Sequence, residues 1–537
     1  MSSALERLLR YVQIDTQSDP HSSASPTTEK QKDLGRLLVT ELHALGLSDA
    51  ELDAHGYVYA TLPATTERSV PVICWCAHMD TSPEAPGADV LPIVHRNYDG
   101  GPIHLPYEGI VLDPTAHPDL GDQVGSAIVT ADGRTLLGAD NKAGIAEIMA
   151  AVEWLAAHPE VPHGTIKILF TPDEEVGRGT AHVDLQRLGA DYAYTVDGER
   201  RGSLEDETFS ADAALLTFTG ANTHPGFAKG KMANALKGAG AVLARLPHEW
   251  SPEGTEGTEG FVHPYEVRGG VETASIEFIL RSFSTDDLRS YAERLRTLAH
   301  EVCTERPGLS YHLEVREQYR NMKEVLDRHP EVANYAEEAM RRAGLTPERG
   351  RIRGGTDGSQ LSFMGLPTVN IFAGEHAFHS RYEWVSEADM EYAVQTLIEL
   401  AQVWADASNK LLVSGLSAQH PRVEGVPARA EKQRSQKRQR KKQGVLFVAE
   451  GVCPVCAKGG DQHREGRGSR KPASFKAHNH GQGSSKFSKN SQRQANFRTQ
   501  AGKIVKFDFA PRKQLEQFGV SVGEHQCGGA DAQQRQA

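Results

Sequence analysis

Apolar residues recur along the first 410 positions of this chain in two alternating patterns. Apolar side chains three and four residues apart predict amphipathic helices, and short apolar runs between them predict buried strands. Helices are expected near 5–12, 29–45, 142–157 and 386–405, and strands near 70–77, 165–170, 192–196 and up to residue 372. Strands separated by helices favour an α/β fold, with a mostly parallel central sheet covered by helices on both faces.

A different pattern occupies residues 211–320. Strands are expected near 213–218, 273–281 and 309–316, helices near 232–245 and 286–303, and a loop rich in Pro, Glu, Gly and Thr at 251–260. This succession predicts an inserted α+β module. The expected organisation is an α/β domain in two parts, 1–210 and 321–410, the module 211–320 between them, and a tail, 411–537.

Charge separates the tail from the rest of the chain. The 537 residues carry a formal charge of −12, but residues 411–537 hold 24 Lys and Arg against 9 Asp and Glu, a net +15. The first 410 residues hold the other 35 basic and 62 acidic side chains, a net −27. The tail shows little apolar periodicity, which predicts a basic, low-complexity, disordered segment.

Four interpretations of the tail stay open. Its dense basic run at 431–442 admits nucleic-acid binding through phosphates, although a solvated polycationic segment is the simpler interpretation. Cys453 and Cys456 form a CxxC motif, but no second close pair at finger-like spacing supports a zinc knuckle. The composition also fits an unrelated reading frame appended to the chain.

Composition excludes several classes of protein. No run of about 18 apolar residues exists, so no transmembrane helix is expected. The first ten residues lack the apolar segment of a secretory signal. Six cysteines are sparse for this length, and Cys74 and Cys76 share one face of a predicted strand. A disulfide framework is therefore not expected, and we expect a cytoplasmic location.

Five short polar segments stand at or near the ends of predicted strands. Taken singly, each has an ordinary interpretation as a helix cap, a turn or a solvated loop. Because ligands collect at the carboxyl ends of parallel strands, the segments together predict one site. Their His and carboxylate side chains suit Zn²⁺, Co²⁺ or Mn²⁺, and two ions bridged by one carboxylate would use five of them. The candidates are His78 and Asp80, Asp140, Glu174 and Glu175, Asp197, and one or both of His376 and His379.

Six motifs, taken in order along about residues 3–408, resemble those of metallopeptidase family 20. The segment from Arg353 to Pro367 is particularly similar to the members of that family that act as tripeptide aminopeptidases. The motifs are His78-Met-Asp-Thr-Ser-Pro, Gly-Ala-Asp140-Asn-Lys-Ala-Gly, Asp-Glu174-Glu175-Val-Gly, Thr-Val-Asp197-Gly-Glu, His224-Pro-Gly and Arg353-Gly-Gly-Thr-Asp-Gly.

The resemblance implies a peptidase with two zinc ions per subunit, which attacks the peptide bond with water activated between them. It assigns the general base to Glu174 and the orientation of His78 to Asp80. It also implies a cis peptide between Asp140 and Asn141. The implied ligands are His78 and Asp197 for one ion, Glu175 and His379 for the other, and Asp140 as the bridge.

The inserted module is expected to act as a lid or dimerisation domain. Its His224 would stabilise the oxyanion, from the same chain or from the other subunit of a homodimer. Arg281 and Arg353 are candidates to bind the terminal carboxylate of a tripeptide, and Asn321 is a further candidate contact. Lys142 and Lys229 are expected to be solvated or capping. A same-family alternative is an amidohydrolase or dipeptidase, and a different-class alternative is nucleic-acid binding through the tail.

Overall fold

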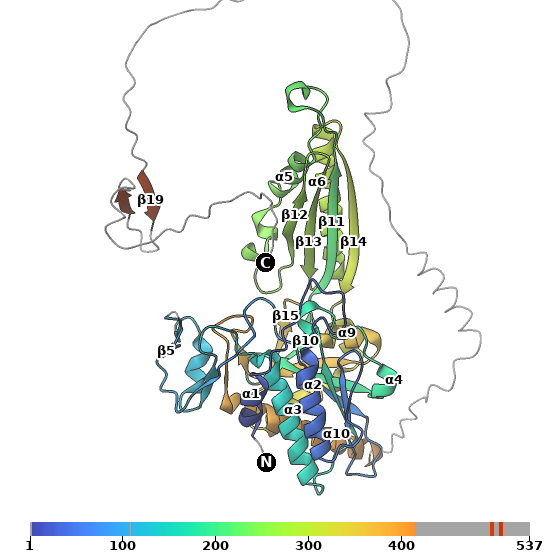
Figure 1. Ribbon diagram of the computed structural model, residues 1–537. Coiled ribbons are helices and arrows are strands. Elements are labelled where there is room, and N and C mark those ends of the chain that lie inside the picture. Colours follow the sequence, from blue (N-terminus) through green and yellow to red (C-terminus); the bar gives the residue numbers. More distant parts are fainter. Residues whose placement is uncertain (1–2, 108, 414–493, 499–503, 509–537) are drawn as a thin grey trace, which may run out of the picture. The chain divides into compact units, whose positions relative to one another are not determined.

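The computed structural model describes residues 3–107, 109–413, 494–498 and 504–508 (Figure 1). The chain divides into two units, Met1–Gly459 and Gly460–Ala537. In the second unit, β19 (Gln494–Arg498) and β20 (Ile504–Asp508) form an antiparallel hairpin. The predicted disorder, the basic run at 431–442 and the CxxC motif at 453–456 lie outside the described residues.

An eight-stranded sheet forms the centre of the first unit, counted over the residues described there. The central pairs β8–β3, β3–β9 and β9–β16 are parallel, and so is the edge pair β10–β15, which confirms the mostly parallel sheet. In sheet order the strands are β1 (Glu51–Leu52), β2 (Val58–Leu62), β8 (Ile166–Thr171), β3 (Ile73–His78), β9 (Tyr192–Gly198), β16 (Thr368–Phe372), β10 (Ser203–Thr208) and β15 (Glu348–Ile352).

Alternate residues of β3 enter two different hydrophobic clusters, because successive side chains of a strand point to opposite faces. Trp75 and Ala77 join the large core, whereas Cys74 and Cys76 join the cluster on the other face, with Leu361 of α9 (Asp357–Met364). Both cysteines are buried and free, as their spacing predicts. The large core is covered by α1 (Ala4–Tyr11), α2 (Gln31–Ala44), α3 (Ala139–Ala157), α8 (Pro330–Arg342) and α10 (Glu387–Val413).

Several short elements, most of them between β3 and α3, were not predicted, because strands of two or three residues leave no periodic signal. A four-stranded sheet runs in the order β17 (Glu375–His376), β18 (Trp384–Ser386), β7 (Ile128–Thr130) and β4 (Ile93–His95) within the described residues. Beside it lie the hairpin β5 (Ile103–His104) and β6 (Val111–Leu112) and the 3₁₀ helix η1 (Pro118–Gln123).

The inserted module contains an antiparallel sheet that packs against two helices (Figure 1). The sheet order is β12 (Phe261–Gly269), β13 (Thr273–Ser282), β11 (Ser210–Thr219) and β14 (Ser310–Tyr319). The helices are α5 (Ala235–Leu243) and α6 (Thr285–Glu305). Buried side chains of these elements form a hydrophobic cluster of their own, including Phe218, Phe278 and Leu295.

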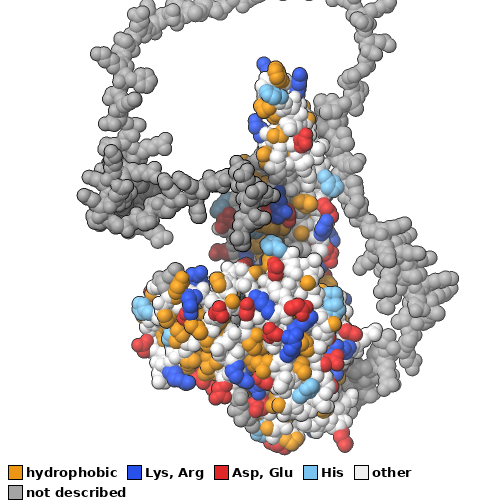
Figure 2. All heavy atoms as spheres, viewed as in Figure 1, with side chains coloured by type: hydrophobic (Ala, Val, Ile, Leu, Met, Phe, Trp, Pro, Cys, Tyr) orange, Lys and Arg blue, Asp and Glu red, His pale blue; other side chains and the backbone are white. Residues whose placement is uncertain are grey.

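The face drawn in Figure 2 interleaves acidic and basic side chains over the α/β part of the first unit. No described helix combines the length and the apolar composition needed to cross a membrane.

Candidate metal centre

The carboxyl ends of the parallel strands bring the predicted ligands to one place. His78 is the last residue of β3, and Asp197 is the last but one of β9. Glu175 lies in the 3₁₀ helix η2 (Glu174–Val176) directly beyond β8. Asp140 stands at the start of α3, where a cis peptide joins it to Asn141, as the resemblance implies. His379 follows β17 with a φ of 58°, in the left-handed region.

Asp140 lies between two histidines, one on each carboxylate oxygen. Its Oδ1 is 2.9 Å from Nε2 of His78, and its Oδ2 is 3.1 Å from Nε2 of His379. His78 Nε2 is also 3.4 Å from Oδ1 of Asp197, and His379 Nε2 is 2.8 Å from Oε2 of Glu175. The five side chains therefore form two groups that share one carboxylate, which is the division implied by the resemblance.

Negative charge dominates this cluster. Burial raises the pKa of Glu175 to about 8. Burial alone would lower the pKa of His379, but hydrogen bonds to Asp140 and Glu175 outweigh it and raise that pKa to about 11. For Asp140 burial acts in the other direction and would raise the pKa, but the hydrogen bonds from His379 and His78 hold that pKa below its usual range. Protonation or a neighbouring positive charge thus relieves the repulsion among the carboxylates.

The donor set fits divalent cations. Ligand atoms of His78, Asp140 and Glu175 all lie within 4.8 Å of one another, and so do those of Asp140, Asp197 and Glu375. Oε1 of Glu175 is buried and has no hydrogen-bond partner among the described residues. A buried carboxylate oxygen without a partner is costly unless a cation or proton satisfies it. Nitrogen and oxygen donors without thiolate suit Zn²⁺, Co²⁺ or Mn²⁺.

The two adjacent glutamates differ in their contacts. Glu175 bonds His379, and its side chain is only 4% exposed. Glu174 is partly exposed, and within the described residues its carboxylate oxygens are among neither the hydrogen-bonded groups nor the buried unpaired ones. Burial raises its pKa well above the ordinary value. This carboxylate therefore has oxygens available to a water or a substrate.

Asp80 contacts both His78 and the two glutamates. The Nδ1 of His78 lies 3.0 Å from the backbone carbonyl of Asp80 and 3.4 Å from its Oδ1. The same carboxylate accepts hydrogen bonds from the backbone N–H of Glu174, at 3.0 Å, and of Glu175, at 3.2 Å. Asp80 thus fixes the turn that carries the glutamates as well as the neighbouring histidine.

Two buried carboxylates at this centre were missed by the sequence. Glu383 accepts from the backbone N–H of Leu137, Gly138 and Asp140 at 2.7, 2.8 and 3.0 Å, and so holds the segment that ends at Asp140. Glu375 has a ligand atom close to those of Asp140 and Asp197. Glu375 lies directly before His376 in one of the five polar segments, whereas nothing in the sequence around Glu383 marks it.

His224 lies away from the other candidates. It lies beyond the end of β11, a strand of ten residues that extends about 30 Å from the α/β part. Its Nδ1 accepts from the backbone N–H of Gly226, its ring lies 5.3 Å from that of Phe227, and it is exposed. His224 thus contacts its own turn rather than the metal cluster.

The two candidate arginines lie at the junction between the α/β part and the module. Arg353 donates to the carbonyl of Gly257 and to Oγ1 of Thr255, each at 2.9 Å, both in the predicted module loop. Nη1 of Arg281 is 3.5 Å from the carbonyl of Arg353, and its buried Nε has no hydrogen-bond partner in the described part of the chain. The Nε–H of Arg281 is therefore without a partner among the described residues, whereas the guanidinium of Arg353 already donates to the module loop.

Asn321 is buried at the same junction, where it bonds three connecting segments. Its Oδ1 accepts from the backbone N–H of Thr208 and Lys323, at 3.1 and 3.0 Å, and its Nδ2 donates to the carbonyl of Phe283, at 3.2 Å. Its amide is thus engaged by the protein itself. Lys142 is not solvated: it is buried and donates to the carbonyl of Ile14 at 2.8 Å, which the helical pattern did not reveal.

Comparison with known proteins identifies the family. The family described as Peptidase family M20/M25/M40 matches residues 127–403. The chain is also 47% identical over 408 residues to a protein named peptidase T from Desulfitobacterium hafniense (strain DSM 10664 / DCB-2), which covers 76% of this chain and 99% of that relative. The chain belongs to this family of peptidases.

Solved structures agree with the family fold. An aminopeptidase PepT from Bacillus cereus ATCC 10987 superposes with a TM-score of 0.59 at 23% identity. A tripeptidase from Staphylococcus aureus superposes with a TM-score of 0.60 at 22% identity. Each likeness covers 75% of this chain and 98% of the solved chain. At these identities the likeness concerns the fold, with its α/β part and inserted module.

Proposed function

We propose that this M20 peptidase is an aminopeptidase that removes the N-terminal residue of tripeptides. The carrying observation is Asp140, whose two oxygens reach two histidines that each have a further carboxylate partner. Family membership and the relative named peptidase T support the reaction class. The tripeptide preference rests on the motif resemblance, and a cytoplasmic location remains a prediction from the cysteine content.

In this proposal His78 and Asp197 hold one divalent ion, Glu175 and His379 hold a second, and Asp140 is shared. When bound, the two ions supply Lewis acidity that polarises the scissile carbonyl and makes water more acidic. Glu174 accepts a proton from the attacking water and delivers one to the leaving amine. Its accessible carboxylate and the engaged carboxylate of Glu175 support this division of roles. Asp80 fixes the positions of both glutamates relative to His78 through its hydrogen bonds to all three residues.

Paired variants test the roles of the two glutamates. We expect Glu174→Ala to keep both metal equivalents and to lose more than about 100-fold in kcat, the usual contribution of a general base. Glu175→Ala should lose one equivalent, because its carboxylate is an engaged ligand. Elemental analysis and turnover of a tripeptide amide bond measure both. Metal loss in Glu174→Ala with retention in Glu175→Ala would show that the two roles are exchanged.

A substrate panel tests the specificity. Di-, tri- and tetrapeptides with free amino termini should be compared with acetylated amino acids, and the tripeptides should give the highest kcat/KM. Preferential cleavage of the acetylated substrates would replace the aminopeptidase with the amidohydrolase of the same family. Preferential cleavage of dipeptides would replace it with a dipeptidase.

The position of His224 favours a homodimer in which this residue serves the other subunit. It is exposed beyond the far end of β11, next to Phe227, whose side chain is 70% exposed. Mixing subunits tests the proposal: His224→Ala chains and Glu174→Ala chains, each nearly inactive, should regain up to about a quarter of the activity together. Mixtures that gain nothing, although light scattering shows mixed dimers, would assign His224 to its own chain or to no catalytic role.

A further inference from the structure

His376, the histidine that the metal centre leaves out, lies in a second cluster of potential ligands. It belongs to the two-residue strand β17, in which successive side chains point to opposite faces. Glu375 points to Asp140 and Asp197, whereas His376 points to Asp119 and Glu199. The segments 197–199 and 375–376 therefore each contribute one residue to either cluster.

The imidazole of His376 is buried without hydrogen bonds. Its side chain is 4% exposed and stacks on Trp384, with ring centroids 4.0 Å apart. Neither ring nitrogen has a hydrogen-bond partner within the described residues. A buried polar nitrogen usually has one, so both atoms require an explanation.

The distances around Nδ1 leave room for an ion rather than a hydrogen bond. Nδ1 of His376 is 3.9 Å from Oδ2 of Asp119 and 4.0 Å from Oε1 of Glu199, which is too long for direct hydrogen bonds. An ion about 2.0–2.2 Å from each donor, as zinc is from nitrogen and oxygen ligands, fits between atoms this far apart. A cavity of about 50 Å³ adjoins the cluster, and its lining includes Asp119, His376 and Asp389. This volume exceeds that needed for one water molecule.

Two arginines partly neutralise the carboxylates around the cluster. Arg200 pairs with Oδ1 of Asp119 at 3.0 Å, and Arg201 pairs with Oδ1 of Asp389 at 3.1 Å. Asp389, whose Oδ2 is 3.7 Å from Nε2 of His376, also accepts from Gln123 at 2.8 Å. Asp122, whose Oδ2 is 3.9 Å from Arg200, also lines the cavity, so with Glu199 the four carboxylates and two guanidinium groups leave two net negative charges. A divalent cation is attracted there less strongly than to the centre at Asp140.

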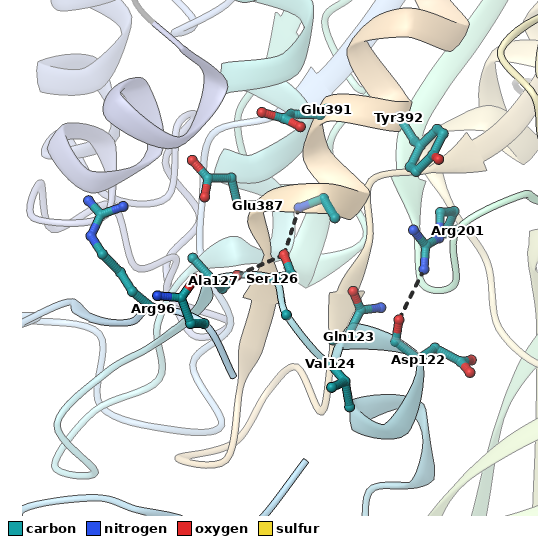
Figure 3. Close-up of a pocket in the computed structure, with 13 residues that line it drawn as sticks. Arg96, Asp122, Gln123, Val124, Ser126, Ala127, Arg201, Glu387, Glu391 and Tyr392 are labelled. Atoms are coloured by element: carbon teal, nitrogen blue, oxygen red, sulfur yellow. Dashed lines mark hydrogen bonds between the residues drawn. The ribbon is translucent and has the colours of Figure 1, made fainter. Parts of the chain in front are cut away.

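We propose that His376 Nδ1, Asp119 and Glu199 form an additional binding site for a divalent transition-metal ion. A single imidazole with two carboxylates suits Zn²⁺, Mn²⁺ or Co²⁺. The ion joins η1, the turn after β9 and strand β17. An open pocket of about 710 Å³ shares Asp122, Gln123 and Arg201 with the small cavity (Figure 3).

Metal content of the full chain tests this site. The protein is equilibrated with Zn²⁺, freed of unbound ion and analysed by mass spectrometry of the elements. Glu199→Gln and His376→Gln should each bind one equivalent fewer than the unchanged chain, and the extra equivalent should leave first on dialysis. Asp122→Asn is the matched control, because it removes a carboxylate from the same pocket without touching the ligand set. It should keep the full number.

Two results would overturn the proposal. One is that Glu199→Gln and Asp119→Asn each bind as much metal as the unchanged chain. Because these two substitutions alter partly exposed side chains, they test the site even if His376→Gln does not fold. The other is loss of the extra equivalent in a Cys453→Ser, Cys456→Ser chain, which would assign it to the tail. With Co²⁺ in place of zinc, the proposed site gives no thiolate charge-transfer band. Because the readout is a difference in metal content, it does not depend on peptidase activity.

Discussion

Glu147 is a buried carboxyl group that no part of the proposed chemistry uses. It lies in α3, is fully buried, and neither of its oxygens has a hydrogen-bond partner among the residues described. Burial, reinforced by the carboxylate of Asp389, raises its pKa well above the ordinary value of 4.5. The group therefore stays protonated in the folded chain at pH values where it ionises in the unfolded chain.

We expect Glu147→Met to stabilise the protein, increasingly so as the pH rises. Between pH 4.5 and the raised pKa, the folded chain holds a proton that the unfolded chain has lost, so the free energy of unfolding falls as the pH rises. Each unit of raised pKa costs about 1.4 kcal/mol once the pH exceeds both values. Methionine has no such dependence and fills a similar volume. Urea unfolding at pH 5 and pH 8 measures the difference.

Glu160→Met is the control for this prediction, because Glu160 is exposed just beyond α3. It should change the free energy of unfolding little at either pH. A gain for Glu147→Met that is equal at pH 5 and pH 8 would mean that the carboxyl group has a partner in the folded chain.

Sequence reasoning located the chemistry of single residues where motifs were available. The predicted ligands His78 and Asp197 lie together because neighbouring parallel strands end at one edge of the sheet. Spacing alone could not choose between His376 and His379. The choice depends on the short strand β17, in which His376 points away from Asp140, and on the loop after it, which carries His379. Glu383 was missed because its role comes from burial and from three backbone donors, which leave no trace in the local sequence.

At the scale of elements, the packing of α3 on β9 places Asp140 near Asp197. Gly144 lies in α3 against the carbonyl of Val196, and a methyl group there would overlap this oxygen and the side-chain oxygen of Asn141. The glycine is thus required for close packing, one turn after Asp140.

We expect Gly144→Ala to lower the free energy of unfolding by about 1–3 kcal/mol, the usual cost of overpacking. It should also weaken metal binding, because α3 must move away from β9. Gly240→Ala in α5 is the matched control: nothing lies within 4 Å of the added carbon, and alanine should stabilise the helix by about 0.5–1 kcal/mol. Urea unfolding and chelator competition measure both variants. Unchanged metal affinity in Gly144→Ala would mean that the contact between α3 and β9 does not influence the metal centre.

Long elements were predictable and short or irregular ones were not. The helices α1, α2, α3 and α10 and the strands β8 and β9 agree with their apolar patterns to within a few residues, apart from an extension of α10 to Val413. Strand β12 was missed because most of its residues are partly or fully exposed and it contains Pro264 and a bulge. Its pairing with β13 comes from the neighbouring strand rather than from its own sequence.

At the scale of the whole molecule, the residues proposed for the chemistry occupy only part of the chain. Every proposed ligand and the proposed base lie between residues 78 and 379, and the match to the Desulfitobacterium relative covers 408 residues. The buried contacts of α10 with the large core extend as far as Trp404. The acidic part and the basic tail are therefore expected to act independently.

A chain ended after residue 413 should keep the metal content at the Asp140 centre and the kcat/KM of the full chain to within about twofold. Any nucleic-acid binding should belong to the full chain alone, since residues 411–537 carry the net +15 while the rest carries −27. Such binding should weaken steeply, by roughly 10-fold or more between about 50 and 200 mM salt, if the tail neutralises several phosphates. Mobility shifts of both chains with duplex DNA, beside tripeptide turnover, measure the two properties separately. A large loss of turnover on truncation would make the tail part of the enzyme, because a solvated appendage has no means to change the geometry at Asp140.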